Sequence, residues 1–176
     1  GFNANIIKKA KTIIKEEYSN VNVSILSIGK KSSEYFEKNG FTVIGSHDAL
    51  FTDLNFENVA SVAEEIMEKF RDCNYDKIDL VYNQFKNAAT QIIIKEDFLP
   101  IQPSENKESF SGDYIFEPVK QEIVDQLIPK SLKTQLFKAI LDSHAAEHGA
   151  RMTAMHKATD NAGELKKELT LTYNKA

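Results

Sequence analysis

The sharpest catalytic pattern in the sequence is the pentapeptide His144-Ala145-Ala146-Glu147-His148. It matches the H-x-x-E-H motif of inverted zinc peptidases, in which two histidines four residues apart hold zinc and the glutamate acts as the base. A third ligand from a distant segment is also required, and Glu164 and Glu168 lie further along the same predicted helix. A zinc peptidase based on His144, Glu147 and His148 is therefore the minor alternative. The favoured interpretation is two polar histidines that face solvent or a partner.

Three other groups carry residue types used in catalysis. Ser46-His47-Asp48 contains the three triad types, but triads assemble in space, so adjacency in sequence argues for nothing. Gly29-Lys30-Lys31-Ser32 follows a predicted strand but lacks the glycine-rich cradle of a phosphate loop, and no G-x-G-x-x-G occurs. Cys73 is the only cysteine, which excludes an internal disulfide, and we interpret it as a packing residue. The sequence therefore predicts no catalytic residue, cofactor, metal or small-molecule substrate.

The spacing of apolar residues predicts the elements that would position these side chains. Helical spacing occurs at residues 3–18, 31–38 and 58–73. Segments rich in β-branched and aromatic residues predict strands at 22–28, 41–45, 77–82 and 89–95, the last two forming a hairpin. This order predicts an α/β fold. Residues 1–128 would form a Rossmann-like layered domain with a largely parallel sheet and helices on both faces.

Two features concern the ends of this domain. A doubly wound sheet usually begins with a strand, whereas this chain begins with a predicted helix and with Gly1 rather than Met. We therefore expect a processed product or an excised piece, with a strand before Gly1. At the other end, residues 100–112 predict a long polar loop and 114–117 a short strand, followed by a helix that Pro129 interrupts or restarts.

Residues 129–176 differ in kind from the domain. From Ser131 to Lys175 there is no proline, and apolar or small residues recur mostly at steps of three, four or seven. They are Phe137, Leu141, Ala145, Met152, Met155, Ala158, Ala162, Leu165, Leu169 and Tyr173. A continuous helix of this length would extend for roughly 65–70 Å at 1.5 Å per residue. We expect it to project from the domain, and its apolar stripe requires a partner helix.

Charge and hydropathy exclude two classes of protein. The chain has 22 Lys and Arg against 26 Asp and Glu, and its net charge of −4 is too mild for a nucleic-acid binder. No apolar run approaches the roughly 20 residues of a membrane helix. Residues 1–128 carry 14 Lys and Arg against 21 Asp and Glu, a net of −7, whereas residues 129–176 carry 8 against 5, a net of +3. A basic tail can mark a partner-binding arm, although a solvated face is the commoner explanation.

The tail carries a long and specific motif. It runs Ala150-Arg151-Met152-Thr153-Ala154-Met155-His156-Lys157-Ala158-Thr159-Asp160-Asn161-Ala162 and is followed by Leu165, Leu169, Leu171 and Tyr173-Asn174-Lys175-Ala176. This string closely resembles the gamma subunit of F-type ATP synthases. The resemblance covers essentially the whole chain, because it extends upstream to Gly1-Phe2-Asn3, Ile28-Gly29-Lys30-Lys31, Tyr82-Asn83-Gln84-Phe85-Lys86-Asn87 and Tyr114-Ile115-Phe116-Glu117-Pro118.

The resemblance implies a non-catalytic subunit, present here as a central fragment without the family's N-terminal helix and C-terminal signature. In that family two long helices flank a Rossmann-like domain and form a rotor shaft inside the ring of catalytic subunits. The implied partners are the alpha and beta subunits of the catalytic head, the epsilon subunit and the membrane c-ring. The implied location is peripheral, on the cytoplasmic face of the bacterial inner membrane, with the mitochondrial matrix side less favoured.

The resemblance also implies three sets of functional residues. The coiled-coil face would be Met152, Met155, Thr159, Ala162, Leu165 and Leu169. The outward basic set, facing acidic loops of the catalytic subunits, would be Arg151, Lys157, Lys166 and Lys167. The foot that meets the epsilon subunit and the ring would be Pro129, Lys130, Leu132 and Gln135. A third hypothesis is an α/β partner-binding module unrelated to ATP synthase. The fragment alone is expected to self-associate, because its stripe and a sheet edge are uncovered.

Overall fold

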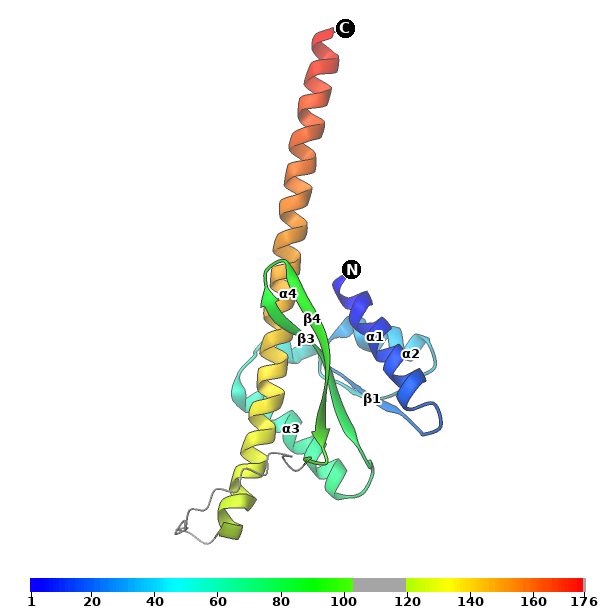
Figure 1. Cartoon of the computed structure of the whole chain (residues 1–176), viewed down its shortest axis with the longest axis vertical. Helices are drawn as coiled ribbons and strands as arrows, with labels where there is room; N and C mark the ends of the chain where they lie inside the picture. The colour runs from blue at the N-terminus through cyan, green and yellow to red at the C-terminus, as the bar shows by residue number, and fades with distance from the viewer. Residues whose placement is uncertain (103–119, 176) are drawn as a thin grey trace, which may run out of the picture.

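The structure, a computed structural model, describes residues 1–102 and 120–175. Its elements are α1 (Phe2–Glu17), β1 (Ser24–Ser27), α2 (Lys30–Lys38), β2 (Thr42–Ser46), the 3-10 helix η1 (Asp48–Phe51), α3 (Phe56–Arg71), β3 (Ile78–Asn87), β4 (Thr90–Leu99) and α4 (Lys120–Lys175). Figure 1 shows a small α/β body beside one very long helix, α4, whose C-terminal part rises away from it. Most of the predicted loop at 100–112 and the predicted strand at 114–117 lie outside the described residues.

The strands of the described residues pair in two sheets of two strands each. β1 and β2 are parallel, with Ser24 opposite Thr42, and α2 is the crossover between them. β3 and β4 are antiparallel, with Tyr82 opposite Ile94. The fold is therefore α/β as predicted, but the expectation of one largely parallel sheet is wrong for this part of the chain. The tight turn at Ala88-Ala89 permits only antiparallel pairing of the strands that it joins.

The β3–β4 hairpin lies between α4 on one side and α1 on the other (Figure 1). Successive side chains of a strand point to opposite faces of the sheet. Leu80 accordingly packs against the core that α3 and α4 share, and Asp79 contacts Tyr18 at the end of α1. The hairpin is thus the layer that connects the N-terminal helices to the long helix.

One hydrophobic core joins α3, the hairpin and the first part of α4. The N-cap of α3 is Asn55, whose side-chain oxygen accepts a 2.8 Å hydrogen bond from the backbone N–H of Asn58. The core residues are Leu50, Val59, Val62, Ala63, Ile66, Phe98, Leu99, Leu132, Leu136 and Ile140. The expectation that the whole tail projects is therefore corrected, because α3 and the hairpin already cover its first part.

Helix α4 is 56 residues long, about 84 Å at 1.5 Å per residue, and Pro129 lies inside it. The predicted interruption at Pro129 is wrong. Proline removes one backbone N–H and crowds the preceding turn, but the burial of Leu132 and Leu136 one and two turns later stabilises the helix across it. Neither α4 nor any other described helix has a stretch that is long and apolar enough to cross a membrane.

Candidate functional site: the free segment of the long helix

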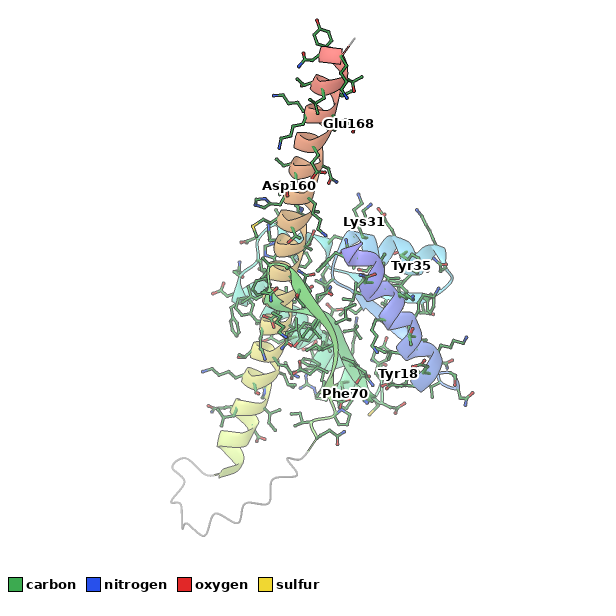
Figure 2. All side chains as sticks on the ribbon, turned by 45° about the horizontal axis from the view of Figure 1, so that its top comes forward. Tyr18, Lys31, Tyr35, Phe70, Asp160 and Glu168 are labelled. Carbon is green, nitrogen blue, oxygen red and sulfur yellow. The ribbon has the colours of Figure 1, made fainter. Side chains whose placement is uncertain are left out.

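The surroundings of helix α4 change from buried to exposed near Gly149. Before that point the helix buries a stripe made of Leu132, Leu136, Ala139, Ile140 and Ala146. Beyond it Thr153 is half-buried, and every residue from 154 to 175 is exposed. We call residues 154–175 the free segment. Figure 2 shows its side chains, including the labelled Asp160 and Glu168, standing clear of the rest of the molecule.

The predicted coiled-coil face lies on the free segment and on the turn before it. The side chains of Leu165 and Leu169 are 56% and 61% exposed, and Met152 and Met155 are about half-exposed. Ala162, Leu165, Leu169 and Tyr173 line one shallow apolar groove along the helix. Thr159 is exposed, and its hydroxyl donates a 3.0 Å hydrogen bond to the Met155 carbonyl oxygen of its own helix. The six residues therefore share a solvent-facing position, and their pairing with a second helix stays a prediction.

The predicted outward basic set is also exposed. Lys157, Lys166 and Lys167 lie on the free segment. Arg151 is one turn earlier and forms an ion pair with Glu147, with 2.5 Å between the guanidinium nitrogen and the carboxylate oxygen. A surface pair of this type contributes less than about 1 kcal/mol, so a stronger acidic partner can replace Glu147.

The predicted foot residues fall into two groups. Pro129 is half-buried and Lys130 is exposed. Leu132 is only 4% exposed and belongs to the core, so its assignment to a partner contact is corrected. Gln135 is half-buried, and its side-chain amide donates to Glu96 Oε1 at 2.7 Å and to the Asp97 carbonyl oxygen at 3.2 Å. Leu132 and Gln135 therefore attach α4 to the body.

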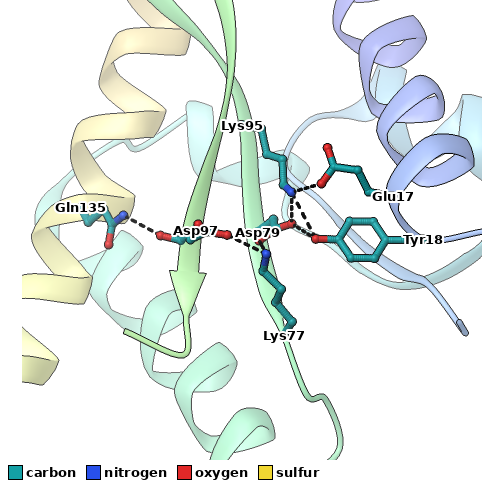
Figure 3. A network of polar contacts seen from close by, with 7 residues as sticks. All are labelled: Glu17, Tyr18, Lys77, Asp79, Lys95, Asp97 and Gln135. Atoms are coloured by element: carbon teal, nitrogen blue, oxygen red, sulfur yellow. Dashed lines mark hydrogen bonds and ion pairs between the residues drawn. The ribbon is translucent and has the colours of Figure 1, made fainter. Parts of the chain in front are cut away.

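A polar network on the hairpin connects α1 to the strands (Figure 3). Lys95 on β4 contacts Glu17 of α1, Asp79 Oδ2 at 3.1 Å and the Tyr18 hydroxyl at 3.2 Å. Lys77, directly before β3, lies 2.7 Å from Asp97 Oδ1 and 3.5 Å from Asp79 Oδ1. The sequence signal for this network is a pair of charged residues two positions apart, at 77 and 79 in one predicted strand and at 95 and 97 at the end of the next. The sequence-based prediction of functional residues did not include this network.

The ion pairs of the network shift the pKa values of their members. The hydrogen bond from Lys77 lowers the pKa of Asp97, and the hydrogen bond to Asp97 raises the pKa of Lys77. Burial lowers the pKa of Lys95, but hydrogen bonds to Glu17, Tyr18 and Asp79 outweigh burial and the pKa is raised. The lysines and Asp97 are therefore charged at neutral pH, and α1, the hairpin and α4 are linked by one charged and polar cluster.

The H-x-x-E-H residues do not form a zinc site. His144 and His148 lie on one helix face, with 3.2 Å between their Nε2 atoms, and the His144 ring stacks on Phe51. Glu147 is engaged by Arg151. Within residues 1–102 and 120–175, no three His, Cys, Asp or Glu side chains are grouped so that they could hold a metal. The motif therefore matches in sequence alone, because no described residue joins the histidine pair as a third ligand.

The other chemical motifs are also placed by local structure. Ser46 Oγ donates to Asp48 Oδ1 at 2.6 Å and bypasses His47, whose Nε2 lies 3.4 Å from Glu65 instead, so no proton relay joins the three. Gly29 precedes α2, and its carbonyl oxygen accepts a 2.7 Å hydrogen bond from Ser32 Oγ. Cys73 is exposed and has a φ of 57°, directly after Asp72, the C-cap of α3, so its interpretation as a packing residue is wrong.

Known proteins resemble this chain both in sequence and in fold. A family model described as ATP synthase matches residues 1–176. The ATP synthase gamma chains of Flavobacterium johnsoniae and Christiangramia forsetii are 58% and 55% identical to the chain, over 99% of its length and 61% of theirs. The chain thus spans about three fifths of these curated relatives. The fold resembles a chain from the Tetrahymena thermophila mitochondrial ATP synthase central stalk and c-ring, with a TM-score of 0.66 and 20% identity over 89% of this chain and 69% of that one.

An α/β body that extends into a long helix with an exposed apolar stripe defines the class, an α/β protein with a projecting helical arm. Within that class, the match over residues 1–176 and the 58% identity to a curated relative are decisive: the chain belongs to the ATP synthase gamma-chain family. This membership overturns both the zinc-peptidase alternative and the hypothesis of an unrelated α/β module.

Proposed function

We propose that this chain forms part of the rotor shaft of a proton-transporting F-type ATP synthase. It would turn with the membrane ring and drive the catalytic subunits through changes in nucleotide affinity, without supplying a catalytic residue. The observation that carries the proposal is the exposed apolar stripe on the free segment, in a chain of the gamma-chain family. A stripe of this size in water is stable when a second helix covers it.

The coiled-coil face supports this proposal through its composition. Thr159 and Ala162 are small and permit close approach of a second helix, and Leu165 and Leu169 supply apolar area. The outward basic residues Lys157, Lys166 and Lys167 would face acidic loops of the alpha and beta subunits. The net charge of +3 on residues 129–176 favours that orientation.

The remaining parts of the proposal concern the body. Residues 1–128 would act as a Rossmann-like domain, with β1, α2 and β2 as its parallel unit, and residues 129–176 as the shaft. Pro129 and Lys130 would contribute to the foot that meets the epsilon subunit and the c-ring. The assembled protein would lie peripherally on the cytoplasmic face of the bacterial inner membrane.

The direct test is assembly of the complete gamma chain with the alpha and beta subunits of the same source. We expect co-expression to yield a complex of the three subunits that hydrolyses ATP. Replacing Leu165 and Leu169 together by Asp should abolish assembly, because two charges would be buried in the shaft. The matched control replaces the exposed Asn161 and Asn174 by Asp, which adds the same charge at positions that belong neither to the predicted face nor to the lining of the groove.

Two results would contradict the proposal. One is a complete wild-type chain that folds but does not co-purify with the catalytic subunits. The other is equal assembly of the Leu165→Asp/Leu169→Asp variant and its control. The foot is tested separately: Lys130→Glu should weaken binding of the epsilon subunit in calorimetry and leave assembly with alpha and beta unchanged.

A further inference from the structure

The turn of the β3–β4 hairpin meets α4 at the point where the helix leaves the body. A Cβ atom added to Gly149 would lie 3.1 Å from both the Cα and the carbonyl oxygen of Ala88, and 3.3 Å from the Phe85 ring. Real Cβ atoms rarely approach other atoms so closely, so only glycine fits here without displacement of the turn. Glycine is also a poor helix former. Its presence inside α4 is therefore explained by contact with the hairpin.

A hydrogen bond fixes the same contact one turn later. Thr153 Oγ1 lies 3.0 Å from the Ala88 carbonyl oxygen and 3.0 Å from the Gly149 carbonyl oxygen, and its hydroxyl donates to this pair. The Ala88 carbonyl oxygen also accepts from the Gln91 side chain at 3.2 Å. Asn87 Oδ1 accepts from the backbone N–H groups of Ala89 and Thr90 at 3.0 and 2.8 Å, which gives the turn a defined shape.

These contacts mark a boundary along the helix. Between Leu132 and Gly149, one side of α4 is covered by α3 and the hairpin, and from residue 154 onward every described side chain is exposed. The turn is the last part of the body that touches α4 before this change (Figure 1).

We propose that the hairpin turn is a clamp on the shaft, formed by Ala88 against Gly149 and Thr153, and that Gly149 and Thr153 are positioning residues. This rests on the proposed function. The clamp fixes the orientation of α4 relative to the body at the point where the free segment begins. It prevents the helix from turning about its own axis there, so rotation of the body is passed on to the free segment. Without the clamp, α4 would be attached to the body only lower down, through its core residues and Gln135.

The first readout is hydrogen–deuterium exchange of amides 86–91 in the complete gamma chain. Thr153→Val keeps the side-chain shape and removes the donor, so these amides should exchange roughly fivefold faster. Gly149→Leu should raise exchange further, because the side chain displaces the turn. The matched controls are Thr134→Val, whose hydroxyl bonds only within the helix, and Gly163→Leu, whose Cβ meets no atom within 4 Å. Both should leave exchange of 86–91 at the wild-type level.

The second readout is the ratio of ATP-driven proton pumping to ATP hydrolysis in the assembled complex. A purely structural loss lowers both rates together, whereas a loosened clamp lowers the ratio at an unchanged melting temperature. We expect Thr153→Val to lower the ratio and Thr134→Val to leave it unchanged. Wild-type exchange at 86–91 in Thr153→Val, or an unchanged ratio in that variant, overturns the clamp even when Gly149→Leu does not fold. Failure of every chain, wild type included, to assemble would overturn the proposed function, and the exchange data would still decide the clamp.

Discussion

At the scale of single residues, Lys95 and Asp79 are the centre of the polar network in Figure 3. Asp79 has a side chain only 10% exposed and is contacted by both lysines of the network and by the Tyr18 hydroxyl. Removing a cation therefore leaves a largely desolvated carboxylate with fewer partners. The contacts span α1 and both strands, so a change at one atom affects how the N-terminal helices sit on the hairpin.

We expect Lys95→Met to lower the free energy of unfolding by about 1–2 kcal/mol, because Asp79 loses its 3.1 Å partner and Glu17 loses its contact to β4. The measurement is urea denaturation at neutral pH. Lys86→Met is the control, since Lys86 is exposed on β3. Equal stability of the two variants would show that the network contributes nothing.

The network also predicts a pH dependence. The pKa of Asp97 is lowered by its hydrogen bond from Lys77. A carboxyl whose pKa is lowered in the folded state stabilises the fold above its unfolded pKa of about 4, and this contribution is lost as the pH falls through the folded value. The raised pKa of Lys77 gives a contribution that is present below about pH 10 and lost as the pH rises through the folded value.

Urea midpoints measured from pH 3 to 11 should therefore decline at both ends, and Lys77→Met should flatten both declines. Lys69→Met serves as a comparison. Its hydrogen bond lowers the pKa of Glu65, so its loss should flatten the acid decline. An acid decline of wild-type size in Lys77→Met would contradict the assigned cause.

At the scale of elements, α4 shows that one continuous apolar periodicity can serve two different surroundings. Leu136 is 2% exposed in the core shared with α3 and the hairpin, whereas Leu165 is 56% exposed on the free segment. The residue type is the same and its spacing in the helix is the same. What differs is the presence of a second element within reach.

We expect Leu136→Ala to lower the free energy of unfolding by about 3 kcal/mol, since it removes buried apolar groups and leaves a cavity. Leu165→Ala should change it by no more than about 0.5 kcal/mol at concentrations low enough for the chain to be monomeric, because its side chain is then 56% exposed. Both values come from urea denaturation of the same 176 residues. A large loss in Leu165→Ala would mean that the free segment is covered in solution.

Pro129 gives a second prediction for α4. Proline inside a helix costs about 3 kcal/mol relative to alanine, and Pro129 lies within a continuous helical stretch. Pro129→Ala should therefore raise the free energy of unfolding by about 1–3 kcal/mol, while Ser131→Ala, at an exposed neighbouring position, should raise it by at most about 0.5 kcal/mol. Destabilisation by Pro129→Ala would indicate that the ring makes a necessary packing contact.

At the scale of the whole molecule, the exposed stripe predicts self-association of this chain. Covering a leucine side chain is worth about 1.5–3 kcal/mol, and the free segment exposes Leu165, Leu169 and Leu171 together with Tyr173. Light scattering at rising concentration should show a mass above that of the monomer. Leu165→Gln/Leu169→Gln should restore the monomer, and Lys166→Gln/Lys167→Gln should not, because it leaves the stripe intact.

The order of elements and the α/β class could be predicted from the sequence, because amphipathic periods and turn residues are local properties. The two separate sheets could not, since strand pairing depends on which edges meet in space. The residue types of the tail indicated an exposed apolar face. The same kind of pattern wrongly assigned Leu132 to a contact with a partner and Cys73 to packing inside the domain. Burial of a side chain depends on what packs over it, and the patterns around these residues do not specify that neighbour.

The sequence by itself determined that a long apolar-striped helix ends this chain, and its motif from Ala150 to Ala162 carried the family resemblance. Only the tertiary structure decided where the helix stops being core and becomes free. That boundary lies at Gly149 and Thr153, where the hairpin turn reaches α4 from more than sixty positions earlier in the chain. A contact between such distant segments is created by folding of the intervening core, so no local pattern of residues could have located it.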